Sequence, residues 1–351
     1  MDYSLTVYWG VLIISSIVFF LYPFKSNRWL PHFLSFLCML LLSGLRSEAI
    51  GKDVGNYVSL FKSFRHIDLE AVFTFRGYVR PDYGYYIITK FISVLSNNTN
   101  FFLFIIAFLT LFLFSYFIYK ESTLPGLSVF LFISTGFYMG TFNIMRQYLA
   151  MSVLYMSIKY IRERKFLSFL IIVILASTIH PSSLFFLILY PLYSFNVNIY
   201  SFFSVLSVSF LIGFAGFKIA PVLRIISENP YFQNLAGGGY NLYFILVLMC
   251  LAGLLLFNTK KDNVKIYFHS LYIAILLQPL AFNIEIVSRI TMIFQFLVII
   301  LIPNLISNLK NKFLKYAFIS LIVFCGILYY STLLNKFNHG GVFPYLFYFQ
   351  H

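Results

Sequence analysis

Charged side chains, and acidic ones above all, are scarce in this sequence. Its 351 residues include only 11 Asp and Glu, and charged residues make up 10% of the chain, against 60% hydrophobic and 21% aromatic residues. Soluble domains carry about a quarter of their residues as charges. The shortage excludes a soluble globular domain and, together with a mean hydropathy of +0.86, predicts a polytopic membrane protein.

Cysteine and the common catalytic motifs are nearly missing as well. Cys38, Cys250 and Cys325 lie in apolar stretches, without paired spacing and without a neighbouring histidine, which excludes a disulfide framework and a zinc site. The sequence has no Walker A motif, no GxGxxG motif after a strand, no HExxH, no GxSxG elbow and no DxD pair. We therefore expect no metal, no cofactor and no cytoplasmic nucleotide-dependent domain.

The net charge of +14 would favour nucleic acid as the ligand of a soluble protein. Here the lysines lie in short connections, such as Lys260-Lys261 and Lys310 to Lys315, where membrane topology and anionic lipid account for them. Membrane lipid is therefore a predicted partner, and nucleic acid is not.

Long apolar runs are abundant in the chain. A bilayer core about 30 Å thick needs ~20 apolar residues per helix. The candidate spans begin near Ser4, Trp29, Phe101, Leu124, Asn143, Phe166, Ser182, Asn198, Tyr240, Val264, Ile286 and Lys315. These runs predict an all-α transmembrane helical bundle of roughly twelve spans, which forms a single domain over residues 1–351. With the lysine clusters in the cytoplasm, both ends of the chain would lie outside.

Two stretches are expected to form loops on the outer face. The first, residues 46–100, holds five of the eleven acidic residues. Within it, Asp82 to Ser96 is apolar but short, and as a span it would invert the threading of everything after it, so we expect an interfacial or re-entrant helix. The second, residues 220–239, contains Arg224 and the triplet Gly237 to Gly239, so it should be mobile.

Arginine and lysine then divide between the two faces. Seven of the ten arginines fall outside: Arg46, Arg65, Arg76, Arg80, Arg146, Arg224 and Arg289. The positive-inside tendency explains the inner lysines but predicts the reverse for these arginines. A guanidinium binds phosphate through two parallel hydrogen bonds, whereas lysine offers a point charge. The asymmetry points to an anionic, phosphate-bearing ligand on the outer face.

The first candidate constellation follows the second span. Arg46 stands where this span leaves the membrane, at the depth of a lipid phosphate, and Asp53 and Tyr57, at i and i+4, share one face if the stretch is helical. The alternative is an interfacial anchor with a solvated charge pair.

The second constellation is Asn143 to Gln147. Arg146 and Gln147 lie in the first turn of an apolar helix, where the helix dipole already favours an anion, so that a cation there calls for a negative ligand. The alternative is a buried structural pair between Arg146 and Glu48, Asp53 or Asp82. Function is favoured, because ionisable groups at membrane depth usually face an interior cavity.

The third and fourth constellations are His180-Pro181 and Glu285 to Arg289. A lone histidine on an apolar helix is more often a core residue, but Pro181 ends this helix and the turn lies on the same face as Arg146. Glu285 and Arg289 are spaced i, i+4 and can pair with each other, in which case Arg289 is structural. If Glu285 points elsewhere, Arg289 joins Arg46 and Arg146 at one site.

These motifs resemble a known family. The matching residues are Gly44-Leu45-Arg46, Gly51-Lys52-Asp53 with Tyr57, Pro81 to Tyr85, Asn143, Arg146-Gln147 with Leu149-Ala150, His180-Pro181-Ser182, and Arg289. In this order, from about Leu42 to Phe296, they resemble the EpsG-type polysaccharide polymerases, relatives of the Wzy O-antigen polymerases. One departure is that the family often has glutamate where this chain has Asp82.

The resemblance implies a glycosyltransferase of the bacterial cytoplasmic (inner) membrane, with an architecture similar to that of GT-C enzymes and an active site on the outer face. It would join oligosaccharide repeat units carried on undecaprenyl pyrophosphate. Arg46, Arg146, Gln147, Arg289 and Tyr57 would bind the pyrophosphate or the glycan. The candidate bases for the acceptor hydroxyl are His180, Asp53 and Asp82. A chain-length regulator is a candidate protein partner.

Three other activities remain alternatives. A flippase for the same lipid-linked sugars would also display arginines, but usually has two related halves and charge near mid-membrane. An O-acyltransferase would need an acyl donor from the inner face, which offers little beyond lysine clusters. An O-antigen ligase, or another lipid-linked glycosyltransferase, uses the same donor and is the hardest to distinguish from a polymerase.

Overall fold

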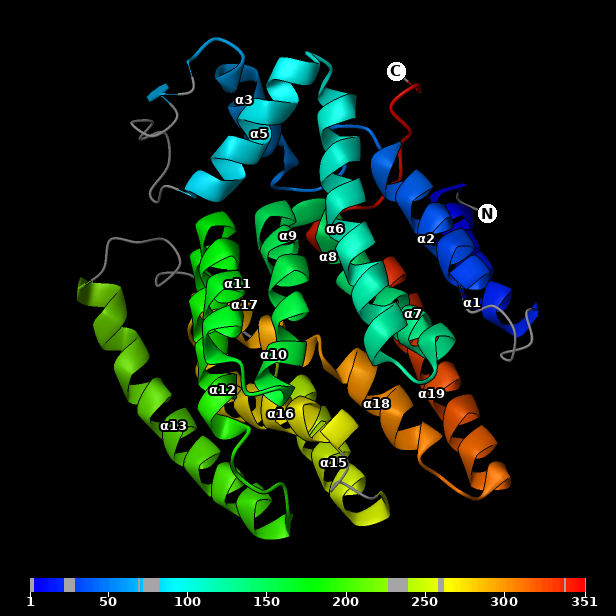
Figure 1. Cartoon of the computed structure of the whole chain (residues 1–351), viewed down its shortest axis with the longest axis vertical. Helices are drawn as coiled ribbons and strands as arrows, with labels where there is room; N and C mark the ends of the chain where they lie inside the picture. The colour runs from blue at the N-terminus through cyan, green and yellow to red at the C-terminus, as the bar shows by residue number, and fades with distance from the viewer. Residues whose placement is uncertain are drawn as a thin grey trace. The chain divides into compact units, whose positions relative to one another are not determined.

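A computed structural model describes residues 3–21, 29–68, 70–71, 82–226, 239–257, 262–337 and 339–350 (Figure 1). Throughout these residues the regular structure is helical, with one isolated bridge between Arg46 and Phe347. The predicted all-α class is therefore confirmed over the described chain. Each of the twelve predicted runs begins within three residues of the start of a helix.

Several of these helices can cross a membrane. The described chain has five helical stretches that are long and apolar enough: Thr99–Glu121, Ile199–Ile219, Val264–Ala281, Glu285–Ser307 and Lys312–Asn335. Pro125–Ser134 and Phe137–Asn143 pass the same test together but are bent by 54°, and would make a sixth span. Five further apolar helices have only 10–17 residues. The chain is thus a multi-pass membrane protein, with fewer full-length spans among its described residues than the roughly twelve predicted.

Local breaks explain part of this difference. Gly136, with a φ of 86°, separates the two helices of the bent pair, because its left-handed backbone turns the chain. Further along, Tyr155–Ser157 forms a 3-10 turn inside another predicted run. A hydropathy count treats each apolar run as one straight helix and misses such breaks.

The chain forms two compact units. Unit 1 comprises Met1–Ile158, Ile171–Pro181 and Tyr316–His351, and unit 2 comprises Lys159–Leu170 and Ser182–Lys315. The helices of unit 1 are α1 (Tyr3–Leu21), α2 (Trp29–Gly44), α3 (Val54–Phe64), α5 (Tyr83–Leu95), α6 (Thr99–Glu121), α7 (Pro125–Ser134), α8 (Phe137–Asn143), α9 (Met145–Leu154), η1 (Tyr155–Ser157), η3 (Leu333–Phe337) and η4 (His339–Gly341). The boundary between the units falls at or within α10 (Ile158–Arg162), α11 (Phe166–Ile179), η2 (Pro181–Ile188) and α19 (Lys312–Thr332).

In unit 1, the region predicted as an outer loop is largely helical. Val54, Tyr57, Val58 and Phe61 form one buried face of α3, at the spacing of an amphipathic helix. This face packs against α5 and α6, and Phe61 stacks on Phe102 with 4.6 Å between the ring centroids. Figure 1 shows α3 and α5 side by side near the start of α6. The candidate residues of this region are therefore set on a packed helical frame.

The stretch from Asp82 to Ser96 forms α5, which has thirteen residues and is too short to cross a membrane. It buries Tyr85, Tyr86 and Ile92 and exposes Phe91 and Val94. Its helical nature is as predicted, while its interfacial or re-entrant placement stays a prediction.

Unit 2 is built around α16 (Asp262–Ala281), which packs against five other helices of this unit. These are α12 (Leu189–Leu192), α13 (Ile199–Ile226), α15 (Tyr240–Leu256), α17 (Glu285–Gln295) and α18 (Val298–Ser307). Helix α13 continues to Ile226, so the first part of the predicted loop 220–239 is helical. Residues 227–238 lie outside the described residues, and so does the side chain of Arg224.

Candidate functional site

Arg146 and Asp82 form the centre of the candidate site. Arg146, in the first turn of α9, donates a hydrogen bond from Nη1 to Oδ2 of Asp82, which directly precedes α5, at 2.6 Å. The Asp82 side chain is only 6% exposed, whereas the Arg146 side chain is 29% exposed. Such a charge-assisted bond is short and strong, and it fixes the start of α5 against the start of α9.

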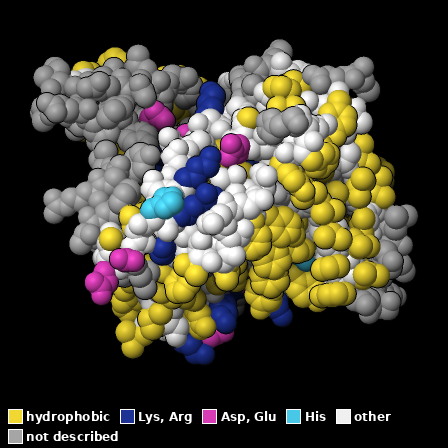
Figure 2. All heavy atoms as spheres, turned by 90° about the horizontal axis from the view of Figure 1, so that it is seen from above, with side chains coloured by type: hydrophobic (Ala, Val, Ile, Leu, Met, Phe, Trp, Pro, Cys, Tyr) yellow, Lys and Arg dark blue, Asp and Glu magenta, His cyan; other side chains and the backbone are white. Residues whose placement is uncertain are grey.

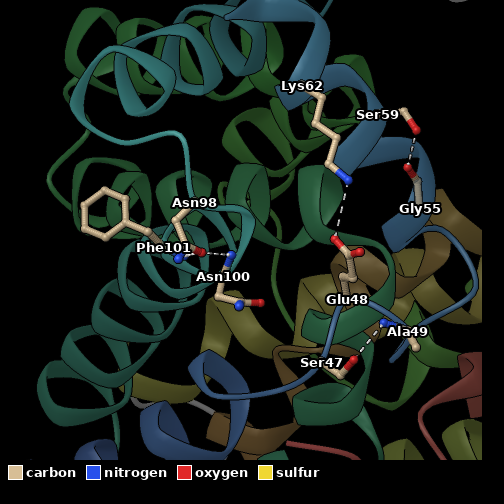
Figure 3. Close-up of polar contacts among 9 residues, drawn as sticks. All are labelled: Ser47, Glu48, Ala49, Gly55, Ser59, Lys62, Asn98, Asn100 and Phe101. Carbon is tan, nitrogen blue, oxygen red and sulfur yellow. Dashed lines mark hydrogen bonds and ion pairs between the residues drawn. The ribbon is translucent and has the colours of Figure 1, made fainter. Parts of the chain in front are cut away.

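Glu48, another predicted partner of Arg146, is engaged elsewhere. Glu48 lies 3.9 Å from the amino group of Lys62, with both side chains about half exposed (Figure 3). Of the three acidic residues predicted as partners of Arg146, Asp82 is the one that pairs with it in the structure.

Figure 3 also shows Asn98, whose side chain caps α6 by accepting hydrogen bonds from the backbone N–H groups of Asn100 and Phe101.

Two tyrosines flank the pair. The guanidinium of Arg146 lies 5.5 Å from the ring centroid of Tyr57, a cation–π distance, and the rings of Tyr57 and Tyr85 meet edge to face at 5.8 Å. Tyr57 belongs to α3 and Tyr85 to α5, so three helices hold the guanidinium plane. The structure thus brings Tyr57, from the first predicted constellation, against Arg146 of the second.

Arg146 keeps hydrogen-bonding capacity beyond this pair. Its Nε is buried, and no described residue accepts a hydrogen bond from it. A guanidinium has five N–H donors, of which one is directed at Asp82. Because the side chain is also partly exposed, Arg146 is the candidate arginine of unit 1 that is open to an anionic ligand.

Asp53 lies at the start of α3, and its backbone N–H donates to the side-chain oxygen of Asn143 at 2.9 Å. Asn143 ends α8, three residues before Arg146. The Asp53 side chain is half-buried, and its carboxylate has no hydrogen bond or ion pair among the described residues. Asp53 is therefore tied by its backbone to the α8–α9 junction, with a carboxylate available for a ligand or a proton.

His180 directly follows α11, which ends before Pro181 as expected. The His180 side chain is half-buried. Two residues earlier, Thr178 lies against Gly84 of α5: a Cβ built on Gly84 would stand 2.2 Å from Oγ1 and 2.9 Å from the carbonyl carbon of Thr178. Only glycine permits this approach. The turn with His180 thus lies beside the helix that Asp82 begins. The next segment is the 3-10 helix η2.

Arg46 occupies a different place from the one predicted. Its side chain is 1% exposed, not at the surface. The guanidinium donates to the carbonyl oxygens of Ser43 and Phe142 and to Met145 Sδ, and lies 5.1 Å from the ring centroid of Phe142. Burial lowers the pKa of Arg46 to about 10. Arg46 therefore joins the end of α2 to the start of α9 from inside the protein.

Gln147 and Arg289 are the other two residues predicted to bind the ligand. Gln147 is fully buried within α9. Arg289 belongs to unit 2, where its Nη2 lies 3.8 Å from Oε1 of Glu285, one helical turn away. This ion pair corresponds to the predicted alternative in which Arg289 pairs with Glu285 and has a structural role. Arg76 and Arg80 lie outside the described residues.

Figure 2 shows the molecule from above the view of Figure 1. Lys and Arg side chains lie in a broken line that runs from top to bottom, left of the centre of this view, with Asp and Glu side chains nearby, and hydrophobic side chains gather on the right and along the lower part. Among the described residues, no group of three His, Cys, Asp or Glu is placed to hold a metal ion.

Comparison with known families agrees with this arrangement of motifs. The EpsG family matches residues 29–347, nearly the whole chain. The chain belongs to the EpsG family. No curated protein and no solved structure gave a match. The family resemblance predicted from the sequence is confirmed, and it makes the chain a member of a family of polysaccharide polymerases.

The EpsG match includes every candidate residue in both units. In this EpsG protein, Arg146, Asp82 and Tyr57 were predicted as site residues, whereas the contact of Gly84 with Thr178 and the backbone pairing of Arg46 with Phe347 were not predicted. Gly340-Gly341 after the last apolar run was the available indication of a tight backbone arrangement there.

Proposed function

We propose that this EpsG-family protein is a polysaccharide polymerase that joins oligosaccharide repeat units carried on undecaprenyl pyrophosphate, at the outer face of the bacterial cytoplasmic membrane. The observation that carries the proposal is the cluster of Arg146, Asp82 and Tyr57, which sets a partly exposed guanidinium beside a buried carboxylate.

The reaction defines what the site must supply. The acceptor hydroxyl oxygen forms a bond to the anomeric carbon of the donor glycan while the bond from that carbon to the pyrophosphate oxygen breaks. The lipid pyrophosphate leaves with the bonding electron pair, and the acceptor proton passes to a base. Catalysis therefore needs positive charge at the leaving phosphates and a base beside the acceptor.

Arg146 is assigned to the leaving pyrophosphate. Its Nη1 is held by Asp82 and its plane lies near the Tyr57 ring, so the guanidinium is oriented before the donor arrives. The partly exposed guanidinium has donors beyond the bond to Asp82, and these are available to a phosphate oxygen. Arg46 is assigned a positioning role. Through its contacts with Phe142 and Met145, it fixes the backbone that leads into Arg146. Arg289, paired with Glu285, has no role in this cluster.

Asp82 is assigned as the base that takes the acceptor proton. While it is paired with Arg146, its carboxylate is a weak base, because the neighbouring cation stabilises the charged form. Donor phosphates at Arg146 compete for the same guanidinium and so weaken its hold on Asp82. Donor binding would then strengthen the base. Asp53 and His180 are the alternatives for this role, and Asp53 has the carboxylate without a described partner.

Gel analysis of surface glycan in a deletion strain tests the function. A product with a single repeat unit supports a polymerase, the absence of any surface repeat favours a flippase, and polymer left on its lipid carrier favours a ligase. Complementation with His180→Ala, Asp53→Asn and Asp82→Asn then tests the base. Loss of the polymer ladder only with Asp82→Asn supports the assignment, while an unaltered ladder with that variant contradicts it.

A further inference from the structure

The segment that follows the last long helix lies against the loop between α2 and α3. The backbone N–H of Ser47 donates to the carbonyl oxygen of Leu346 at 2.8 Å, and that of Tyr348 donates to Leu45 at 3.0 Å. Between them, Arg46 and Phe347 form an antiparallel bridge, the one isolated bridge of the described chain. This pairing joins residues about 300 positions apart in the sequence and passes directly over Arg46.

A second pair of backbone bonds reaches the other end of the same loop. The N–H of Gly51 donates to Gly341 at 3.0 Å, and that of Lys52 donates to Gly340 at 2.9 Å. Asp53 is the next residue. The segment Gly340–Tyr348, which we call the strap, therefore holds the loop both at Arg46 and immediately before Asp53.

The strap is itself anchored to α1 and α2. Tyr345 is 1% exposed, and its hydroxyl donates to the carbonyl oxygen of Leu42 at 2.7 Å. Its backbone N–H donates to the hydroxyl of Ser4 at 3.0 Å, and the hydroxyl of Tyr8 donates to the carbonyl oxygen of Val342. These bonds fix the middle of the strap independently of the loop, so the loop is held against a stable support.

Glycines allow the close approach. Gly51, Gly340 and Gly341 have φ of 106°, 76° and 70°, in the region that disfavours residues with a Cβ. A Cβ on Gly340 would meet the Asn143 side chain at 3.0 to 3.2 Å, and a Cβ on Gly51 would meet the carbonyl oxygen of Phe142 at 3.0 Å. The glycines thus bring strap, loop and Asn143 together, and Asn143 is the residue that accepts the hydrogen bond from the Asp53 backbone.

We propose that the strap is a positioning element for the candidate site, which sets Arg46 and Asp53 relative to the α8–α9 junction that carries Arg146. The inference rests on the proposed function for its catalytic meaning. The strap would contribute no group to the reaction. It acts through Asp53, by way of the Gly340–Lys52 bond and Asn143, and through Arg46, by way of the bridge to Phe347.

The alternative is that the strap only stabilises the fold, and the geometry separates the two roles. The Tyr345 and Tyr8 bonds anchor the strap to α1 and α2, whereas Gly340 and Gly341 contact the loop and Asn143. Gly340→Val therefore disturbs the loop contact and leaves the anchors in place. Leu346→Ala is the matched control, because its side chain is 38% exposed and its carbonyl bond to Ser47 is kept.

The test combines two measurements on the full-length protein in detergent or nanodiscs. Hydrogen–deuterium exchange reports the loop 45–53 against α6, and polymerisation of lipid-linked repeat units gives kcat and KM. For Gly340→Val we expect faster exchange confined to the loop and kcat lower by about tenfold or more, since small misplacements of catalytic groups cost rates of this order. Leu346→Ala should match the wild type in both measurements.

Unchanged loop exchange in Gly340→Val, or faster exchange with wild-type kcat, overturns the proposal. If Gly340→Val does not fold, Gly341→Ala applies the same test with a smaller side chain at a positive φ. Failure of the proposed function has a different outcome: the wild-type protein itself would not polymerise lipid-linked repeat units, while the exchange result for the strap would be unaffected.

Discussion

Arg146 and Asp82, 64 residues apart in the sequence, form an ion pair of 2.6 Å at the junction of α9 and α5. The carboxylate is almost completely buried and the guanidinium is partly open, so the pair presents its cationic side to a ligand. Removing either partner leaves the other charge with less compensation in a chain that has few charges. The pair is therefore both a structural link and the place where a change in charge has the clearest effect.

Arg146→Lys tests whether guanidinium geometry is needed. Lysine keeps the positive charge and its attraction to Asp82, but it loses the planar set of donors that can bind phosphate through two parallel hydrogen bonds. We expect long-chain polymer to be lost, with polymerisation reduced by about a hundredfold, a magnitude typical of removing one preorganised donor. Membrane insertion, measured by the amount of protein in the membrane fraction, should be normal. Polymer of wild-type length in this variant would refute the assignment.

Asp82→Asn and Asp82→Glu separate charge from packing. Asparagine keeps the shape but removes the proton acceptor and the ion pair, and should abolish polymerisation and lower the free energy of unfolding by about 1–3 kcal/mol. Glutamate restores both groups with one extra methylene and should recover measurable activity. Thermal unfolding and polymer ladders are measured on the same preparations. Activity with asparagine at this position, or equal loss with both variants, would contradict a role as base.

The sequence predicts the starts of the helices well because apolar runs and their polar boundaries are local features. It does not predict that Arg46 is buried, because the acceptors of its guanidinium, Phe142 and Met145, are nearly a hundred residues away. For the same reason Glu48, Asp53 and Asp82 could not be separated as partners of Arg146 from spacing alone. The strap depends on backbone pairing between Ser47 and Leu346, which hydropathy does not record.

The membrane topology inferred from the lysine clusters can be tested without a catalytic assay. Reporter fusions after Ser63, which precedes the end of α3, and after Lys261, within a lysine cluster, should report opposite compartments. The reason is that lysine clusters are retained in the cytoplasm, whereas the α3 region is predicted to face outside. Agreement between the two fusions would contradict the threading, and with it the outer placement of the candidate site.

Gly84→Ala tests whether the contact between α5 and α11 places the start of α5 correctly. The added methyl group would stand 2.2 Å from Oγ1 and 2.9 Å from the carbonyl carbon of Thr178, so the two helices must separate. Overpacking of this kind costs about 1–3 kcal/mol, and because Asp82 and His180 lie two residues from the contact, we expect a loss of polymerisation as well.

A matched variant distinguishes this local displacement from general destabilisation. Gly55 also lies in a helix of unit 1, but a Cβ built on it meets no atom within 4 Å, so Gly55→Ala should retain both thermal stability and polymer length. In the double variant Gly84→Ala/Thr178→Gly, the closest clash with the hydroxyl is removed while the contact with the backbone carbon remains, so recovery should be partial. Full activity of Gly84→Ala alone would mean that the distance between α5 and α11 is not critical for the site, and that Asp82 is held by its ion pair with Arg146.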